Sequence, residues 1–192
     1  MKGLEDLEKR VRIILGTRKS KQIQEDYLTP AAILFPLFKK DRGHHVLFTK
    51  RTETVKHHKG EISFPGGVYD HEDETLERTA LRESFEEIGL REKDIEILGR
   101  LDDVETITRY VIRPFVGIFP YPYPFAVNRH EIEETLEVPL KSLLERDRFE
   151  EKKIFLDGGE RTIFTYRYGN HLIWGATAKI LKQFLDLIRS SP

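Results

Sequence analysis

Residues 74–90 read ETLERTALRESFEEIGL and combine a helical apolar repeat with a dense cluster of acids. Thr75 to Ile88 are predicted to form one helix, because apolar side chains recur at spacings of about three and four residues. Gly89 follows as a suitable residue for a left-handed C-terminal cap. The side chains expected on the apolar side of this helix are Leu76, Ala80, Leu81, Phe85 and Ile88.

Three glutamates, Glu83, Glu86 and Glu87, stand at positions i, i+3 and i+4 of this helix. Side chains at these spacings share one face, where like charges destabilise a helix by about 0.2–0.5 kcal/mol per pair. A hard dication bound between them reverses the sign of that interaction. The cluster therefore predicts a magnesium or manganese site, in which Arg82 can orient one carboxylate. The alternative is a solvated acidic face.

The segment before the helix has the opposite character. Residues 57–67 read HHKGEISFPGG, and residues 49–60 are net basic whereas residues 70–87 are strongly acidic. Gly66 and Gly67 permit close approaches that a side chain forbids, so this turn can place the backbone beside a phosphate. A basic wall facing a metal-charged acidic wall suits a polyanionic phosphate ester. Hydrolysis of a pyrophosphate is the reaction that this arrangement favours.

The chain has 192 residues, a length suited to one domain with a well-filled core. Its 39% hydrophobic and 34% charged residues are typical of soluble globular proteins, and no apolar run approaches the roughly 20 residues of a membrane helix. Residues 1–16 mix charged and apolar positions and lack the pattern of a signal peptide. We therefore expect a cytoplasmic protein without a membrane span.

Cysteine is absent, so any bound metal must use oxygen or imidazole ligands. The formal net charge of -1 provides no overall attraction for nucleic acid or for a membrane. Attraction for an anionic ligand must then come from local patches. We expect a small-molecule substrate, no nucleic-acid partner and no membrane partner, and the sequence leaves room for a homodimer.

Several apolar runs bounded by Gly, Pro or charged turns predict a central sheet. These runs are residues 31–38 and 45–51, which resemble a hairpin, and residues 95–98, 112–119 and 161–168. Residues 4–15 are predicted to form an amphipathic helix. A last helical repeat consists of Trp174, Thr177, Ala178, Leu181, Phe184, Leu185 and Ile188. The elements favour one α/β domain with α/β/α layers, in which the last helix closes over the sheet.

At residues 74–90 the sequence resembles the Nudix hydrolases, whose signature is G-x5-E-x7-R-E-U-x-E-E-x-G-U with U a bulky aliphatic residue. Glu74, seven further residues and RESFEEIGL match it, except that Ser84 stands at the first U position. Six residues rather than five separate Gly67 from Glu74, which puts Asp73 at the usual Glu position. The roles of Glu74 and Asp73 therefore stay open.

This resemblance implies the Nudix fold, an α+β structure in which a mixed β-sheet lies between helices. It implies a single Nudix domain at residues 1–192. Within that domain, residues 1–30 form an N-terminal helical extension and residues 66–90 form the Nudix loop and helix.

A second motif is similar to that of the coenzyme A pyrophosphatase branch of the family, L-L-T-x-R-[SA]-x3-R-x3-G-x3-F-P-G-G. Residues 47–67 read LFTKRTETVKHHKGEISFPGG and keep every spacing. Phe48, Thr52 and Lys56 replace the usual residues, and Lys56 keeps the charge while losing the fork of an arginine. Looser similarity to this branch brings the matched region to roughly residues 31–185.

The resemblance implies hydrolysis of the pyrophosphate in coenzyme A or its thioesters, which gives 3',5'-ADP and 4'-phosphopantetheine or its acyl form. It assigns Arg82, Glu83, Glu86 and Glu87 to catalysis, the three glutamates as ligands of Mg²⁺ or Mn²⁺. It assigns substrate binding to Arg51, Lys56, Gly66 and Gly67. The general base is left open among Glu83, Glu87, Glu131 and Glu134.

Two rival functions remain at this point. The first is a Nudix pyrophosphatase for another nucleoside diphosphate derivative, such as ADP-ribose or a dinucleotide, and the second is a catalytically silent nucleotide-binding module. His57 and His58 are interpreted as solvated or structural rather than as metal ligands. Trp174 is expected to pack in the core rather than to stack on adenine.

Overall fold

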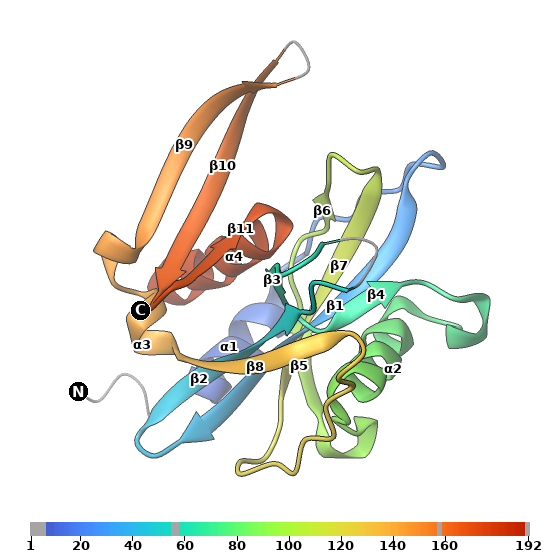
Figure 1. Ribbon diagram of the computed structural model, residues 1–192, viewed down its shortest axis with the longest axis vertical. Helices are drawn as coiled ribbons and strands as arrows, with labels where there is room; N and C mark the ends of the chain where they lie inside the picture. The colour runs from blue at the N-terminus through green and yellow to red at the C-terminus, as the bar shows by residue number, and fades with distance from the viewer. Residues whose placement is uncertain (1–6, 55–57, 157–158, 191–192) are drawn as a thin grey trace.

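The computed structural model describes residues 7–54, 58–156 and 159–190 (Figure 1). Its helices are α1 (Leu7–Thr17), α2 (Leu76–Ile88), α3 (Leu140–Leu143) and α4 (Gly175–Ser190), with short 3₁₀ turns η1 (His71–Asp73), η2 (Glu92–Asp94) and η3 (Arg146–Arg148). Its strands are β1 (Thr29–Lys40), β2 (Gly43–Arg51), β3 (Ile62–Ser63), β4 (Gly66–Val68), β5 (Glu96–Arg100), β6 (Val104–Glu105), β7 (Tyr110–Ile118), β8 (Ile132–Pro139), β9 (Phe149–Leu156), β10 (Gly159–Tyr168) and β11 (His171–Trp174).

The larger sheet has the strand order β3-β2-β1-β7-β5, with β8 on β2, β4 on β1 and β6 on β7. Strands β1 and β2 form the predicted hairpin, with Lys40 opposite Gly43 at its turn. Strand β1 also pairs with β7 in parallel, from Thr29 opposite Tyr110 to Leu37 opposite Ile118. The sheet is therefore mixed, as the sequence analysis predicted.

Helices cover both faces of this sheet, as Figure 1 shows. Along β1, Phe35 and Leu37 pack into the core that includes α1 and α4, whereas Leu34 and Phe38 pack into the core beneath α2. Successive side chains of a strand point to opposite faces, and all four of these are fully buried. Each side chain of this size contributes about 1.5–3 kcal/mol by leaving water. The predicted α/β/α layering is confirmed.

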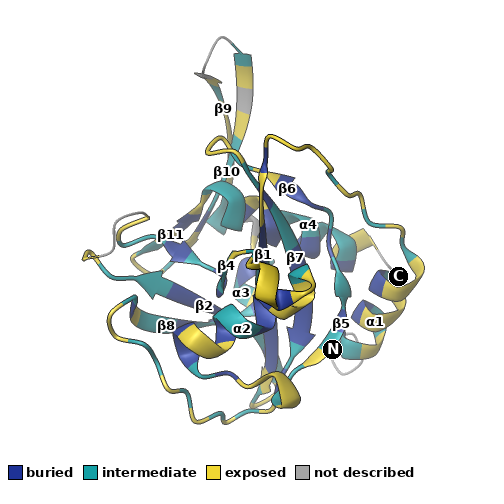
Figure 2. Ribbon diagram, turned by 90° about the vertical axis from the view of Figure 1, so that its right-hand side faces the viewer, coloured by how far each residue is buried: buried dark blue, intermediate teal, exposed yellow. Residues whose placement is uncertain are grey.

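A smaller sheet with the order β11-β10-β9 holds a long two-stranded ribbon, β9 with β10, that extends beyond the layered body (Figure 1). Strand β10 was predicted, whereas β8, β9 and β11 were not. At the base of the ribbon, the ring of Phe149 lies 5.0 Å from that of the buried Tyr166. Figure 2 shows the far part of the ribbon largely exposed.

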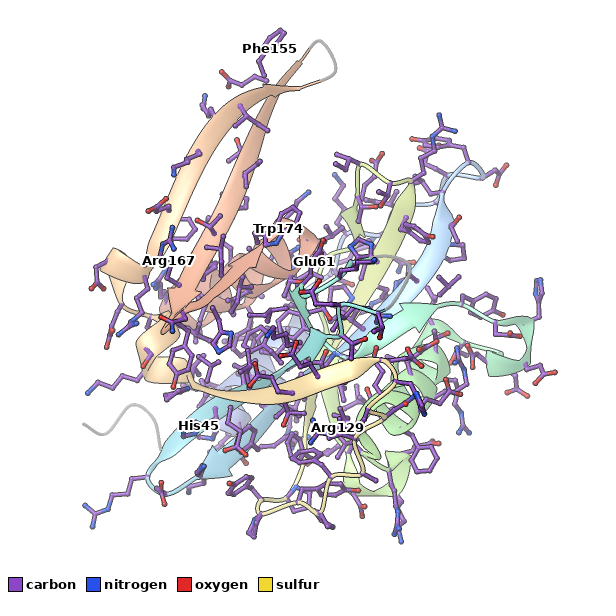
Figure 3. The ribbon with its side chains drawn as sticks, in the orientation of Figure 1. His45, Glu61, Arg129, Phe155, Arg167 and Trp174 are labelled. Atoms are coloured by element: carbon purple, nitrogen blue, oxygen red, sulfur yellow. The ribbon has the colours of Figure 1, made fainter. Side chains whose placement is uncertain are left out.

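The expected packing of Trp174 in a helical stripe is wrong. Trp174 ends strand β11, opposite Thr165 of β10, and α4 begins only at Gly175. Its side chain, labelled in Figure 3, is 46% exposed. The helical repeat continues through Ala178 and Leu181 into the core, so the error arose where a strand runs directly into a helix.

The predicted apolar side of α2 is also wrong at one position. Phe85 is 54% exposed, although it was expected to face inward. The buried side of the helix consists of Thr79, Ala80, Leu81, Ser84, Glu87 and Ile88. Ser84 is fully buried, and its hydroxyl donates to the Ala80 carbonyl at 2.7 Å. A small residue here lets the helix approach the sheet closely, and Glu87 lies on the same buried side.

The first predicted helix appears as α1, whose buried side chains are Leu7, Val11 and Leu15. Leu4, which the same repeat includes, lies outside the described residues. None of the described helices is long and apolar enough to cross a membrane.

Candidate active site

Helix α2 is fixed at both ends by the signals that its sequence carries. The Thr75 hydroxyl accepts from the Arg78 amide at 3.2 Å as the N-cap, and Gly89 adopts the left-handed conformation with φ 70°. The Gly89 amide donates to the Phe85 carbonyl at 2.8 Å. The helix therefore presents its glutamates in a defined register next to β4 and β1.

Asp73 is the acid that anchors Arg82. Its carboxylate accepts from Arg82 Nε at 2.7 Å and from Arg82 Nη2 at 3.1 Å. The Thr79 hydroxyl and the Asp70 amide donate to the same carboxylate at 2.8 and 3.1 Å. These bonds, the one from Arg82 first, lower the pKa of Asp73 to about 2. Asp73 is thus a buried partner of the arginine that stays charged at neutral pH.

Glu74, at the signature position, does not contact this network. Its backbone has φ 61°, and its side chain is exposed without a hydrogen bond or ion pair among the described residues. The capping box formed by Asp70 and Asp73 closes the 3₁₀ turn one residue earlier. The extra residue of the loop is absorbed at Glu74, and Asp73 takes the place that the signature gives to Glu.

Arg82 in turn contacts two of the three predicted metal ligands. Its Nη1 lies 2.8 Å from Glu83 Oε1 and 3.0 Å from Glu86 Oε2. The Glu86 side chain is largely exposed, whereas Glu83 is mostly buried. Burial raises the pKa of Glu83, and the bond from Arg82 opposes this shift. Arg82 therefore contacts both Glu83 and Glu86, whereas the sequence suggested that it orients one carboxylate.

Gly67 makes room for Glu83. A Cβ atom on Gly67 would overlap the Glu83 carboxyl carbon and lie 2.5 Å from its Oε1. At Gly66 a side chain is excluded by a different contact: a Cβ there would overlap the backbone of β1 at Ala32 and Ile33. The two glycines thus bring β4 against β1 and against the helix carboxylate. Their contact with a phosphate stays a prediction.

Glu87 is the buried carboxylate of the cluster, with only 2% of the residue exposed. Burial raises the pKa of Glu87 to about 8, although the nearby Arg51 lowers it. Arg51 Nη1 lies 3.3 Å from Glu87 Oε1, whereas the buried Oε2 has no hydrogen-bond partner among the described residues. A buried oxygen of this kind is costly without a ligand, which points to one that this structure does not include.

Arg51, predicted to bind substrate, connects α2 to the loop before β8. Besides Glu87 it contacts Glu131, with 3.7 Å from its Nη2 to Glu131 Oε2. Asn128 Nδ2 holds the other oxygen of Glu131 at 3.1 Å. Glu134, which is part of β8, by contrast lies 3.6 Å from Nζ of Lys50 on β2. Of the two later candidates for the general base, Glu131 shares an arginine with the helix cluster.

The remaining predicted residues lie away from the cluster or outside the description. Lys56 and His57 fall outside the described residues. His58 is exposed and lies 3.0 Å from Glu61, in agreement with the structural interpretation given to it. A surface depression between α2 and η2 is lined by Asp73, Arg82 and Phe85 among others, and it does not include Glu83 or Glu87.

The described residues hold no group of three or more His, Cys, Asp or Glu side chains already arranged around a metal. Arg82 and Arg51 contact the three helix glutamates instead. The donor chemistry nevertheless fits a hard divalent cation, because three carboxylates share one helix and one buried oxygen lacks a partner. Arginines neutralise this acidic site here, and a cation would take over part of that task.

Comparison with known proteins supplies independent findings. The family model of the NUDIX domain matches residues 28–157. A protein of Photorhabdus laumondii named "Uncharacterized Nudix hydrolase NudL" is 33% identical over 159 residues, which cover 83% of this chain and 84% of that protein. A relative of the same name from Cronobacter sakazakii is 31% identical, covering 84% of each chain.

Among solved structures, a MutT/nudix family protein from Enterococcus faecalis aligns with a TM-score of 0.56 at 14% identity. That alignment covers 95% of this chain and 70% of the other. The Nudix hydrolase RenU from M. smegmatis aligns with a TM-score of 0.51 at 22% identity, covering 59% and 72%. At these identities the similarity concerns the fold.

Proposed function

Because the chain belongs to the Nudix hydrolase family, whose members act on nucleoside diphosphate derivatives, we propose that its substrate is coenzyme A or one of its thioesters. The reaction is hydrolysis of the pyrophosphate bond, with 3',5'-ADP and 4'-phosphopantetheine or its acyl form as products. This assigns the chain to the coenzyme A pyrophosphatase branch, which residues 47–67 resemble.

One observation carries the proposal: both ends of the segment 47–67 reach the carboxylates of α2. Near its start, Arg51 contacts the buried Glu87 at 3.3 Å. At its end, Gly67 lies against the Glu83 carboxylate. The described ends of the motif that resembles the coenzyme A branch therefore lie against the helix that the whole family shares, which supports a common site.

Nudix hydrolases act with divalent metal ions, and we assign Mg²⁺ or Mn²⁺ to this chain. Glu83, Glu86 and Glu87 would hold it. When bound, such an ion neutralises phosphate charge and lowers the pKa of a coordinated water. Asp73 and Arg82 position these glutamates. Arg82 forms ion pairs with Glu83 and Glu86, and the ion pair with Asp73 holds Arg82 in place.

Arg51 has the position and the chemistry of a phosphate-binding residue. Its side chain is partly exposed, and its guanidinium faces two acids, Glu87 and Glu131. A phosphate can accept from the same planar fork, since Arg binds phosphates in a bidentate manner. We propose that Arg51 and Lys56 together bind the additional phosphate of coenzyme A.

For the general base, the contact network favours Glu131 over Glu134. Glu131 shares Arg51 with Glu87, whereas Glu134 is held by Lys50. Glu83 and Glu87 stay candidates by position. Glu131→Gln should lower kcat by about 10²–10⁴-fold if Glu131 abstracts the proton. Glu134→Gln is the matched control, and an equal loss in both variants would leave no distinction between the two acids.

The substrate is tested by comparing coenzyme A, dephospho-coenzyme A and ADP-ribose with the purified protein and Mg²⁺, with the products identified by mass spectrometry. Coenzyme A should be cleaved with the highest kcat/KM and should give 3',5'-ADP. Equal kcat/KM values on all three substrates would reject the coenzyme A assignment while leaving a Nudix pyrophosphatase of broader range.

The metal assignment has a readout besides turnover. Mn²⁺ should raise the melting temperature of the wild type, because a ligand that binds only the folded state stabilises it. Glu87→Gln should lose most of this shift and nearly all activity without unfolding. Glu133→Gln, which changes an exposed glutamate paired with Lys50, is the control. A silent nucleotide-binding module would show the Mn²⁺ shift without any turnover.

A further inference from the structure

The outer edge of the ribbon is a strand edge that no described element covers. Strand β9 pairs with β10 from Phe149 opposite Tyr166 to Leu156 opposite Gly159. Its other edge has no strand partner among the described residues, because β9 ends the sheet order β11-β10-β9. A free edge presents unpaired N–H and C=O groups to any strand that fits it.

Charged residues usually protect such an edge, but here their order matters. The middle of β9 reads Glu150, Glu151, Lys152 and Lys153, all exposed. A parallel, in-register neighbour of the same sequence would oppose like charges. An antiparallel copy can instead place Glu151 of one strand opposite Lys153 of the other, and opposite charges across strands stabilise a pair. The edge is therefore complementary to itself.

Apolar side chains flank this charged centre on both sides. Phe149 is half-buried at the base of the ribbon, while Phe155 near the tip is 78% exposed and points away from the body (Figure 3). The two are on the same face of the strand, because side chains alternate along it. An exposed aromatic ring at this end of the edge lacks any packing role within the described chain.

We propose that the outer edge of β9 is an interface with a second copy of this chain, in which the two β9 strands pair antiparallel about a two-fold axis at Lys152. The axis stands perpendicular to the shared sheet, so opposed side chains lie on one face. Phe149 then lies opposite Phe155 of the second copy, and Glu151 lies opposite its Lys153. Both contacts occur twice, since the interface is isologous.

The one like-charged pair of this register is compensated by neighbours. Lys152 lies opposite Lys152 of the second copy, on the other face of the strand. Glu150 already pairs with Lys152 of its own chain at 2.8 Å, and Glu150 of the second copy becomes a diagonal neighbour. Two lysines and two glutamates thus form one alternating group. The dimer would contain a continuous sheet of the order β11-β10-β9-β9-β10-β11.

The test is sedimentation velocity with light scattering over a concentration series of the full chain. The wild type should reach twice the chain mass of 22.6 kDa. Glu151→Lys should shift the dissociation constant at least tenfold toward monomer, and so should Lys153→Glu. Glu105→Lys is the matched control, because Glu105 is an exposed strand glutamate on β6, away from the ribbon. Circular dichroism checks that each variant is folded.

Charge exchange separates this register from a general effect of charge. The double variant Glu151→Lys/Lys153→Glu restores opposite pairs and should dimerise again. Mixing the two single variants should yield a heterodimer, because lysines of one then face glutamates of the other. A wild type that stays at the monomer mass up to high concentration overturns the proposal. So does a Glu151→Lys variant that dimerises like the wild type, or a folded double variant that remains monomeric.

Discussion

At the scale of single residues, the site depends on which acids are buried and what faces them. Asp73 and Glu87 are buried, and each contacts one arginine, Arg82 or Arg51. Burial alone raises the pKa of both acids, and their hydrogen bonds make the difference. Four hydrogen bonds to Asp73 keep it charged, whereas Glu87 has an oxygen without a partner and a raised pKa. Asp73 therefore holds Arg82 in place, and Glu87 is a proposed metal ligand.

Asp73→Asn should lower the free energy of unfolding by about 2 kcal/mol, because it weakens a buried, charge-assisted bond to Arg82. The activity should fall as well, since Arg82 positions Glu83 and Glu86. Urea unfolding and kcat/KM measure both effects. Glu74→Gln, at the neighbouring position, is the control. It should change neither the free energy of unfolding nor kcat/KM, because Glu74 is exposed. A larger effect of Glu74→Gln would contradict the assignment of Asp73.

The stability contributed by Asp73 also has a defined pH range. Its pKa of about 2 in the folded protein lies below the ordinary value of 3.8. The contribution is therefore fully present above about pH 4 and is lost as the pH falls toward 2. Acid unfolding followed by circular dichroism should show a transition in this range that is shallower in Asp73→Asn. Identical acid transitions in the two proteins would be evidence against it.

Glu87 should give the opposite pH dependence in metal-free protein. Its pKa is raised from 4.5 to about 8, so the folded state keeps a proton that the unfolded chain loses. The free energy of unfolding should therefore decrease as the pH rises from about 4.5 to about 8. Glu87→Gln removes this slope and should be the more stable protein at pH 9 in EDTA. Glu86→Gln, at an exposed position, should follow the wild type.

At the scale of elements, β4 can pack closely against α2 because Gly67 has no side chain, which leaves room for the Glu83 carboxylate. Gly67→Ala should push the Glu83 carboxylate out of place and reduce kcat/KM by at least about tenfold, as misplacement of a catalytic group does. Gly43→Ala is the control, because a Cβ there would meet nothing within 4 Å. Equal activity of Gly67→Ala and wild type, with the fold intact, would show that Glu83 tolerates displacement.

Elements with strong local signals were predictable from the sequence, and those shaped by neighbours were not. The β1–β2 hairpin and the ends of α2 follow from apolar runs, Thr75 and Gly89. Strand β9 was missed because four consecutive charged residues give no alternation. The inward turn of Glu87 was missed because a glutamate carries no apolar signal, and the small Ser84 was the clue that could have revealed it.

At the scale of the whole molecule, protection from amide hydrogen exchange should differ strongly between the layered body and the ribbon. Amide hydrogen exchange should be slowest at the centre of β1, around Leu34 and Phe35, which pairs with β7 along one edge and is buried on both faces. On the other edge, the Leu34 amide donates to the Pro65 carbonyl at 2.9 Å. Exchange should be fastest toward the far end of the ribbon. Exchange in residues 150–154 should slow with rising protein concentration while β1 stays unchanged. Exchange in β9 that is independent of concentration would argue against the two-fold pairing.

The layers were predictable from the sequence, but the way in which the chain closes them was not. Apolar runs and three helical repeats indicated a sheet between helices. The parallel pairing of β1 with β7 joins residues far apart in the chain, and no local pattern reports it. The same holds for the loop before β8, which brings Glu131 to Arg51.

That long-range pairing has a consequence for synthesis on the ribosome. Helix α2, with all of its glutamates, emerges before β7 and β8 exist. Distant strands pair late, because the entropy of closing a long loop must be overcome first. A nascent chain therefore displays the acidic helix before Glu131 and the sheet enclose it. Catalytic competence should appear as a late event of maturation, after residue 139 has left the exit tunnel.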